Sequence, residues 1–167
     1  MDRRMSTTCS AFCLKPDRPS LEAIVHHLRS KGYSVKISSN EFAANGKKSV
    51  VGWPYWEWDF DLNNEDDEWI LSGTIHLAGE KDAFEYNQYM SGWKTDIQSL
   101  EESPSRSKVL LHLSRTKWTM YVSFNVRNSP NRNRNRNVQD EFLDYLDEYC
   151  GAIAYWDNLQ NFVDSEN

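Results

Sequence analysis

The residues whose types and spacing are most suited to chemistry are three carboxylates at alternate positions, Glu57, Asp59 and Asp61. On a strand, such side chains share one face and lie roughly 6 to 7 Å apart. That spacing suits an acid and base pair, or oxygen ligands for a divalent cation. Acid–base catalysis also requires surroundings that separate the two pKa values, and the neighbours here are further acids. The pattern therefore favours a charged surface over a catalytic pair.

The same stretch, residues 53–68, alternates aromatic and acidic residues and then becomes an acidic turn. It holds seven negative charges and no Lys or Arg, whereas the whole chain has a formal net charge of -6. The acidity is therefore local, and a local field attracts partners of opposite charge. We expect the partner-binding residues to be Tyr55, Glu57, Asp59, Asp61, Glu65, Asp66, Asp67 and Glu68.

The leading functional hypothesis is a non-enzymatic, acidic binding protein that docks and neutralises a basic protein. Inhibitors of nucleases, immunity proteins or antitoxins against toxins, and proteins that mimic nucleic acid have this kind of composition. Complementary charge would steer the association, and some of the seven Trp and eight Tyr would anchor the interface. This hypothesis follows from composition and not from a motif.

Two alternatives belong to other classes. A nucleic-acid-binding module would use Arg132, Arg134 and Arg136, which alternate with Asn, together with Tyr121 on an uncovered sheet face. A sequence pI of about 5.2 argues against it, because phosphate binding needs a concentrated positive face. The other alternative is a small enzyme that uses the carboxylates of Glu57 and Asp59.

The sequence contains no signature of a cofactor, a metal site or a catalytic nucleophile. The nucleophile elbow Gly-x-Ser-x-Gly is absent, and no pair of Cys or His completes a set of four zinc ligands. Cys9, Cys13 and Cys150 are expected to be structural and reduced. No apolar run approaches the roughly 18 residues that cross a bilayer, so a cytoplasmic protein is expected. The pattern does not indicate an oligomeric state.

Hydrophobic periodicity predicts the elements that must position these residues. Strands are expected over residues 10–15, 33–37, 53–62, 69–77, 108–113, 118–126 and 152–156, and helices over 21–31, 82–100 and 138–150. The strands on either side of the acidic turn are predicted to form a hairpin. Residues 128–137 are predicted to be a low-complexity loop, because they contain no apolar residue that could pack.

From residue 69 onward, the expected order is strand, helix, strand, strand, helix, strand, which is the split βαβ order of ferredoxin-like folds. An N-terminal segment adds strand, helix, strand, strand. We therefore predict an α+β fold in which helices cover one face of an antiparallel sheet. Residues 1–167 are expected to form one domain, whose halves 10–62 and 69–156 share a sheet or core. Leu111, Trp118 and Phe124 are predicted core residues.

Overall fold

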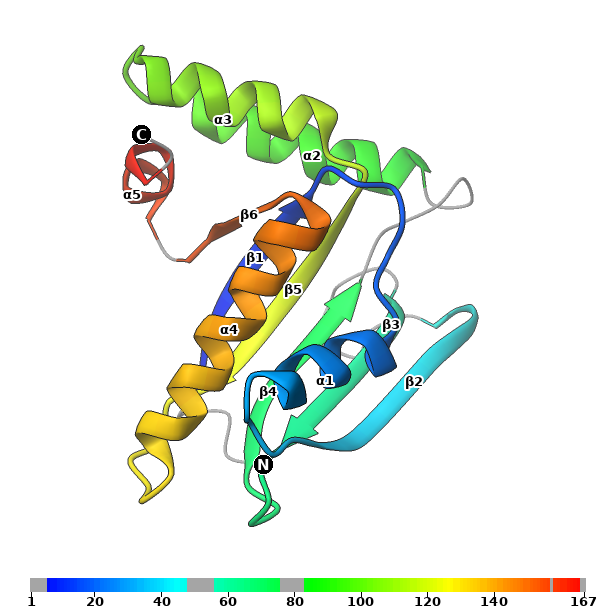
Figure 1. Cartoon of the computed structure of the whole chain (residues 1–167). Helices are drawn as coiled ribbons and strands as arrows, with labels where there is room; N and C mark the ends of the chain where they lie inside the picture. Colours follow the sequence, from blue (N-terminus) through cyan, green and yellow to red (C-terminus); the bar gives the residue numbers. More distant parts are fainter. Residues whose placement is uncertain (1–5, 48–55, 76–82, 157, 166–167) are drawn as a thin grey trace.

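The computed structural model describes residues 6–47, 56–75, 83–156 and 158–165 (Figure 1). Within these ranges the chain forms six strands and five helices. The strands are β1 (Ser6–Cys13), β2 (Lys36–Lys47), β3 (Trp56–Asn63), β4 (Trp69–Ile75), β5 (Trp118–Asn125) and β6 (Ala152–Tyr155). The helices are α1 (Leu21–Ser30), α2 (Ala83–Gln98), α3 (Pro104–Arg115), α4 (Arg132–Cys150) and α5 (Leu159–Asp164). None of these helices is long and apolar enough to cross a membrane.

The six strands form one antiparallel sheet in the order β2-β3-β4-β5-β1-β6 (Figure 1). The predicted hairpin of β3 and β4 is confirmed, with Asp61 opposite Ser72. The α+β class is also confirmed. The ferredoxin-like arrangement is not, because β1 lies between β5 and β6 and residues 108–113 are helical.

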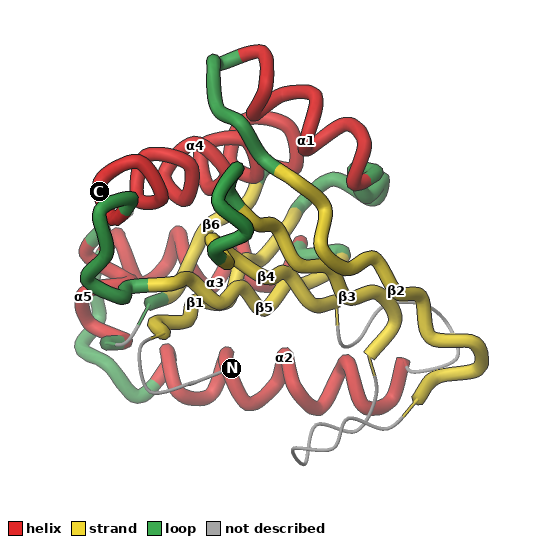
Figure 2. The backbone as a smooth tube through the Cα atoms, turned by 90° about the horizontal axis from the view of Figure 1, so that it is seen from below, coloured by secondary structure: helices red, strands yellow, loops and turns green. Residues whose placement is uncertain are grey.

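Helices cover both faces of the sheet, whereas the sequence predicted helices on one face only (Figure 2). On one face, α1 and α4 pack on the larger hydrophobic core, which includes Cys9, Ala11 and Cys13 of β1. On the other face, the side chain of Phe12 packs with residues of α2, α3 and α5. Because successive side chains of a strand point to opposite faces, β1 contributes to both cores.

Local sequence explains why α1 forms where it was predicted. The hydroxyl of Ser20 accepts a hydrogen bond from the N–H of Ala23 at 3.1 Å, which caps the first turn. The apolar residues then recur at intervals of three and four, so they share one face of the helix. All four are buried against the sheet: Leu21, Ile24, Val25 and Leu28.

The prediction of a strand over residues 108–113 is wrong, because this segment lies in α3. The hydroxyl of Ser103 accepts a hydrogen bond from the N–H of Arg106 at 3.0 Å, and Pro104 follows at the first helical position. Val109 and Leu113, four residues apart, are buried on one face of the helix. Leu111 is 50% exposed and is therefore not a core residue. Trp118 and Phe124 are buried, as predicted.

The prediction of a loop over residues 128–137 is wrong from Arg132 onward, because α4 begins there. Asn135 is buried in this first part of the helix, and its side-chain oxygen accepts a hydrogen bond from Asn64 at 3.2 Å. Gln139, one turn later, donates to the carbonyl oxygens of Ile70 and Asn125 at 3.0 and 2.9 Å. Polar contacts with the turn after β3 and with the sheet therefore hold a segment that contributes no apolar side chain before Val138.

Candidate functional site

The acidic turn between β3 and β4 is organised by the side chain of Asn64, which is only 5% exposed. Its oxygen accepts hydrogen bonds from the backbone N–H groups of Asp66 and Glu68, at 2.9 and 3.1 Å. Asp67 adopts a left-handed conformation with φ of 59°, which Asp and Asn tolerate better than most residues. The turn therefore holds its four acids, Glu65, Asp66, Asp67 and Glu68, in defined positions.

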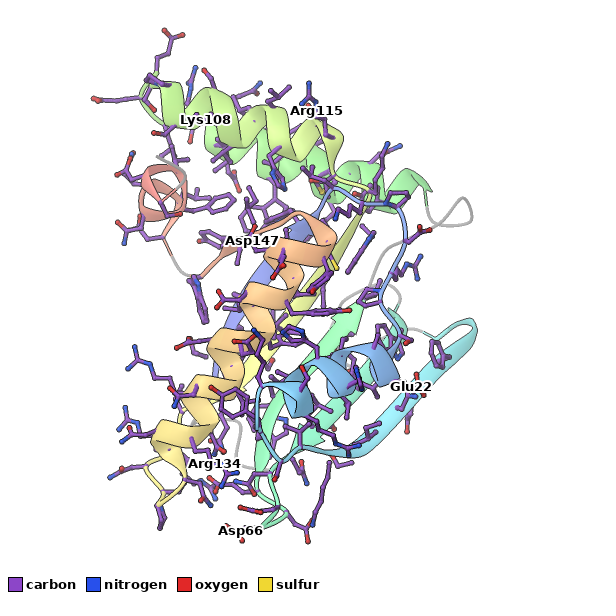
Figure 3. All side chains as sticks on the ribbon, in the orientation of Figure 1. Glu22, Asp66, Lys108, Arg115, Arg134 and Asp147 are labelled. Carbon is purple, nitrogen blue, oxygen red and sulfur yellow. The ribbon has the colours of Figure 1, made fainter. Side chains whose placement is uncertain are left out.

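Most of the acidic side chains in the turn contact other parts of the fold. Glu65 pairs with Arg134 of α4 at 2.9 Å, and Asp67 pairs with Lys36 of β2 at 3.1 Å. Asp66 accepts a hydrogen bond from the side-chain amide of Asn131 at 3.0 Å. Figure 3 shows the labelled Asp66 and Arg134 at the same end of the molecule. The charge of the turn is thus partly neutralised within the chain.

Glu68 is the acid of the turn that is most enclosed by hydrogen bonds. Burial opposes the ionisation of its carboxyl group, but hydrogen bonds from Ser129, Asn131, Asn64 and Asn125 outweigh burial and lower the pKa of Glu68. The amides of Asn131 and Asn64 lie 3.1 and 3.4 Å from this carboxylate. Glu68 therefore joins the turn to α4 and to the end of β5, which makes its role structural.

Asp59 and Asp61 lie on the sheet face opposite to α1 and α4, as the alternation predicted. Their neighbours in β3, Trp58, Phe60 and Leu62, are buried in the larger core.

Across the sheet, Asp59 is opposite Glu41 of β2 and Thr74 of β4, and Thr74 is opposite Tyr121 of β5. In the adjacent row, Asp61 is opposite Ser39 and Ser72, and Ser72 is opposite Ser123. We call these eight residues the acidic face: Ser39, Glu41, Asp59, Asp61, Ser72, Thr74, Tyr121 and Ser123.

Hydroxyl groups of β4 orient the two aspartates of the acidic face. Thr74 Oγ1 donates a hydrogen bond to Asp59 Oδ1 at 2.8 Å, and Ser72 Oγ donates to Asp61 Oδ1. The indole N–H of Trp69 donates to Ser72 Oγ at 2.8 Å, which fixes that hydroxyl in turn. These contacts hold the carboxylates in place without neutralising them, because a hydroxyl carries no charge.

The pKa of Asp59 is raised above its ordinary value. Burial is the main cause, and the nearby carboxylates of Asp61 and Glu41 add to it, while the hydrogen bond from Thr74 opposes it. None of the eight residues of the acidic face is basic. The part of the chain that the structure describes contains no group of three His, Cys, Asp or Glu residues that could hold a metal ion. The carboxylates of the acidic face can therefore attract a cationic surface electrostatically.

The other predicted site residues are distributed over both sides of the sheet. Tyr55 lies outside the described residues, as does the side chain of Glu57. Tyr121 belongs to the acidic face, whereas Arg132, Arg134 and Arg136 lie on α4, which packs on the opposite face. The residues named for a nucleic-acid site therefore do not form one surface. Sequence reasoning missed Glu41, because the strand predicted there ended at residue 37, whereas β2 continues to Lys47.

The cysteines have the properties of structural residues. All three are free and buried. Burial raises the pKa of Cys9 to about 12 and that of Cys150 to about 11. Burial, and after it the proximity of Cys150, also raises the pKa of Cys13. Because the thiolate is the nucleophilic form, these thiols are poor nucleophiles at neutral pH.

Comparison of the chain with family models, curated proteins and solved structures found no match.

Proposed function

We propose that this chain is a non-enzymatic binding protein that docks and neutralises a basic protein in the cytoplasm, as inhibitors, immunity proteins and nucleic-acid mimics do. The observation that carries the proposal is the acidic face. Three carboxylates from two strands, Glu41, Asp59 and Asp61, share it, and no basic residue belongs to it.

The structure changes which acids we assign to the partner. The turn acids are held by Arg134, Lys36 and several side-chain amides, so binding a partner there would require these contacts to be exchanged. The carboxylates of the acidic face receive hydrogen bonds only from hydroxyl groups in the described residues, and their mutual repulsion would be relieved by an incoming Lys or Arg. A basic partner would therefore gain more binding free energy on the acidic face than on the acidic turn.

Preorganisation also supports the acidic face. Thr74 and Ser72 fix the two aspartates before a partner arrives, so fewer rotamers are lost on association. Tyr121 is half-buried beside them and provides an amphipathic ring of the kind that is enriched at interfaces. Charge would then mainly set the association rate and the specificity, while the ring and the strand surface would supply contact area.

The test compares two variants with the same change in charge. The first is the face variant Glu41→Gln, Asp59→Asn and Asp61→Asn, in which Thr74 and Ser72 can still donate to the amide oxygens. The control variant is Asp144→Asn, Asp147→Asn and Glu148→Gln, which removes three exposed acids of α4 on the other face of the sheet. Partners are captured from nuclease-treated lysate by the parent protein, identified by mass spectrometry and purified for kinetic measurements.

We expect the face variant to associate with the captured partner more slowly than the control variant does. Raising the ionic strength from about 0.01 to about 0.15 M should reproduce part of this loss in the parent, because the screening length falls from about 30 to about 8 Å. The face variant should depend less on salt. Equal association rates for the two variants, or capture that disappears after nuclease treatment, would contradict the proposed function.

A further inference from the structure

A cavity of about 670 Å³ lies on the α4 side of the sheet, between the start of α4, the end of β5 and Trp156. Its size falls within the range of about 300 to 1,000 Å³ that is typical of small-molecule sites. Its lining combines cationic, aromatic and amide side chains. The lining includes Phe124, Asn128, Arg132, Asn133, Arg136 and Trp156.

Two arginines supply the charge of this cavity. Arg132 and Arg136 are four residues apart, so they share one face of α4. Both are exposed, and neither forms an ion pair within the described part of the chain. Arg134 differs, because it pairs with Glu65 and is absent from the lining. The one acid in the lining is Asp140, so the lining carries a net positive charge on a chain that is negative as a whole.

The aromatic component is Trp156, which stacks on Phe124 with ring centroids 5.3 Å apart and an interplanar angle of 27°. Phe124 is buried in the main core and so provides a fixed support. Trp156 remains 42% exposed, which is unusual for so large an apolar ring. A supported and exposed indole is a surface on which a planar ring can stack.

We propose that this cavity binds a single nucleotide. Its phosphate would lie between Arg132 and Arg136, where guanidinium groups can form bidentate hydrogen bonds. Its base would stack on Trp156. The exposed amides of Asn128 and Asn133 lack a partner among the described residues, and they can donate to or accept from the edge of a base.

A single nucleotide fits the surroundings better than a nucleic-acid strand does. Beyond the cavity, α4 continues with the exposed acids Asp144, Asp147 and Glu148, which would repel the next phosphates of a strand. The cavity and the acidic face are on opposite sides of the sheet. Each can therefore bind, or fail to bind, independently of the other.

The experiment is calorimetric titration of the full chain with the four common nucleoside monophosphates, with adenosine, with inorganic phosphate and with a five-residue single-stranded oligonucleotide. The variants are Arg132→Gln with Arg136→Gln, Trp156→Leu and the control Arg134→Gln. Circular dichroism and thermal unfolding confirm that each variant is folded.

We expect at least one monophosphate to bind the parent, with an affinity about tenfold or more weaker in the double arginine variant and unchanged in the control. Trp156→Leu should weaken binding of the monophosphate and of adenosine, but not of phosphate. Failure of all four monophosphates to bind at millimolar concentration would overturn the proposal, as would binding that is indifferent to the arginines. An oligonucleotide that binds much more tightly than the monophosphate would show that the ligand is a strand.

Discussion

Replacing Gly73 with alanine tests the close packing between β4 and the aromatic core. A Cβ atom at this position would lie 2.5 Å from Cε1 and Cζ of Phe60 and 3.0 Å from Sδ of Met120. Phe60 is fully buried, with its ring centroid 4.9 Å from that of Trp58 and 6.2 Å from that of Phe142. The ring has little room to move away from the new methyl group. We therefore expect Gly73→Ala to lower the free energy of unfolding by about 1–3 kcal/mol.

The matched control is the same substitution at Gly92. This glycine is exposed in α2, and a Cβ atom added there would have no atom within 4 Å. Alanine is the better helix former, so Gly92→Ala should raise the free energy of unfolding by about 0.5–1 kcal/mol. The same substitution is thus predicted to lower the free energy of unfolding at Gly73 and to raise it at Gly92.

The assay is equilibrium unfolding in urea, followed by far-UV circular dichroism and repeated by thermal denaturation. For a domain of this size, about 1 kcal/mol corresponds to a shift of roughly 2–4 °C in Tm. Phe60→Leu should cost at least about 0.5 kcal/mol less in the Gly73→Ala background than in the parent, because the smaller side chain relieves the clash. If Gly73→Ala is as stable as the parent, the packing described for Phe60 is incorrect.

Three further predictions concern titration, polar packing and thiol reactivity. Because the folded-state pKa of Asp59 is raised, ionisation of its carboxyl group destabilises the fold. Lowering the pH from about 7 to about 4 should therefore increase the contribution of Asp59 to the free energy of unfolding. Urea unfolding of Asp59→Asn across this range should lack that contribution. Asn135→Ala should cost about 1–3 kcal/mol, because the buried amide of Asn64 loses the acceptor oxygen of Asn135 and keeps only its 3.4 Å contact with Glu68. The exposed control Asn133→Ala should change the unfolding free energy by less than about 0.5 kcal/mol. The three buried cysteines should react with a disulfide reagent at pH 8 only after unfolding, so rapid labelling of the native protein would contradict the burial of the thiols.

Hydrophobic periodicity predicted the elements with regular patterns and failed where a short apolar run was ambiguous. The run Val109 to Leu113 is compatible with a buried strand or with a helix. The deciding signal lies before it, in Ser103 and Pro104, which cap and begin α3. The predicted strand over residues 108–113 took no account of this capping signal. The element order that suggested a ferredoxin-like fold depended on that strand.

The start of α4 could not be predicted from local pattern at all. Its Arg residues favour a helix, but the Asn residues that alternate with them have low helix propensity, and the segment has no apolar face. What holds this segment is a set of contacts with the acidic turn, including the hydrogen bond between Asn135 and Asn64, which are 71 residues apart in the sequence. Tertiary contacts of this kind override local propensity, and a single sequence does not reveal them.

The same contacts explain why the acids of residues 57–68 do not act as one group. Counting charges along the chain treats Asp61 and Glu65 alike, yet Glu65 is paired with Arg134 while Asp61 is bonded to a hydroxyl. The fold also adds Glu41, from a strand that the sequence places some twenty residues earlier, to the carboxylates of β3. Local acidity is therefore a property of strand pairing as much as of composition. A basic partner that is steered to this protein should distinguish the sheet face from the turn, although both look equally acidic in the sequence.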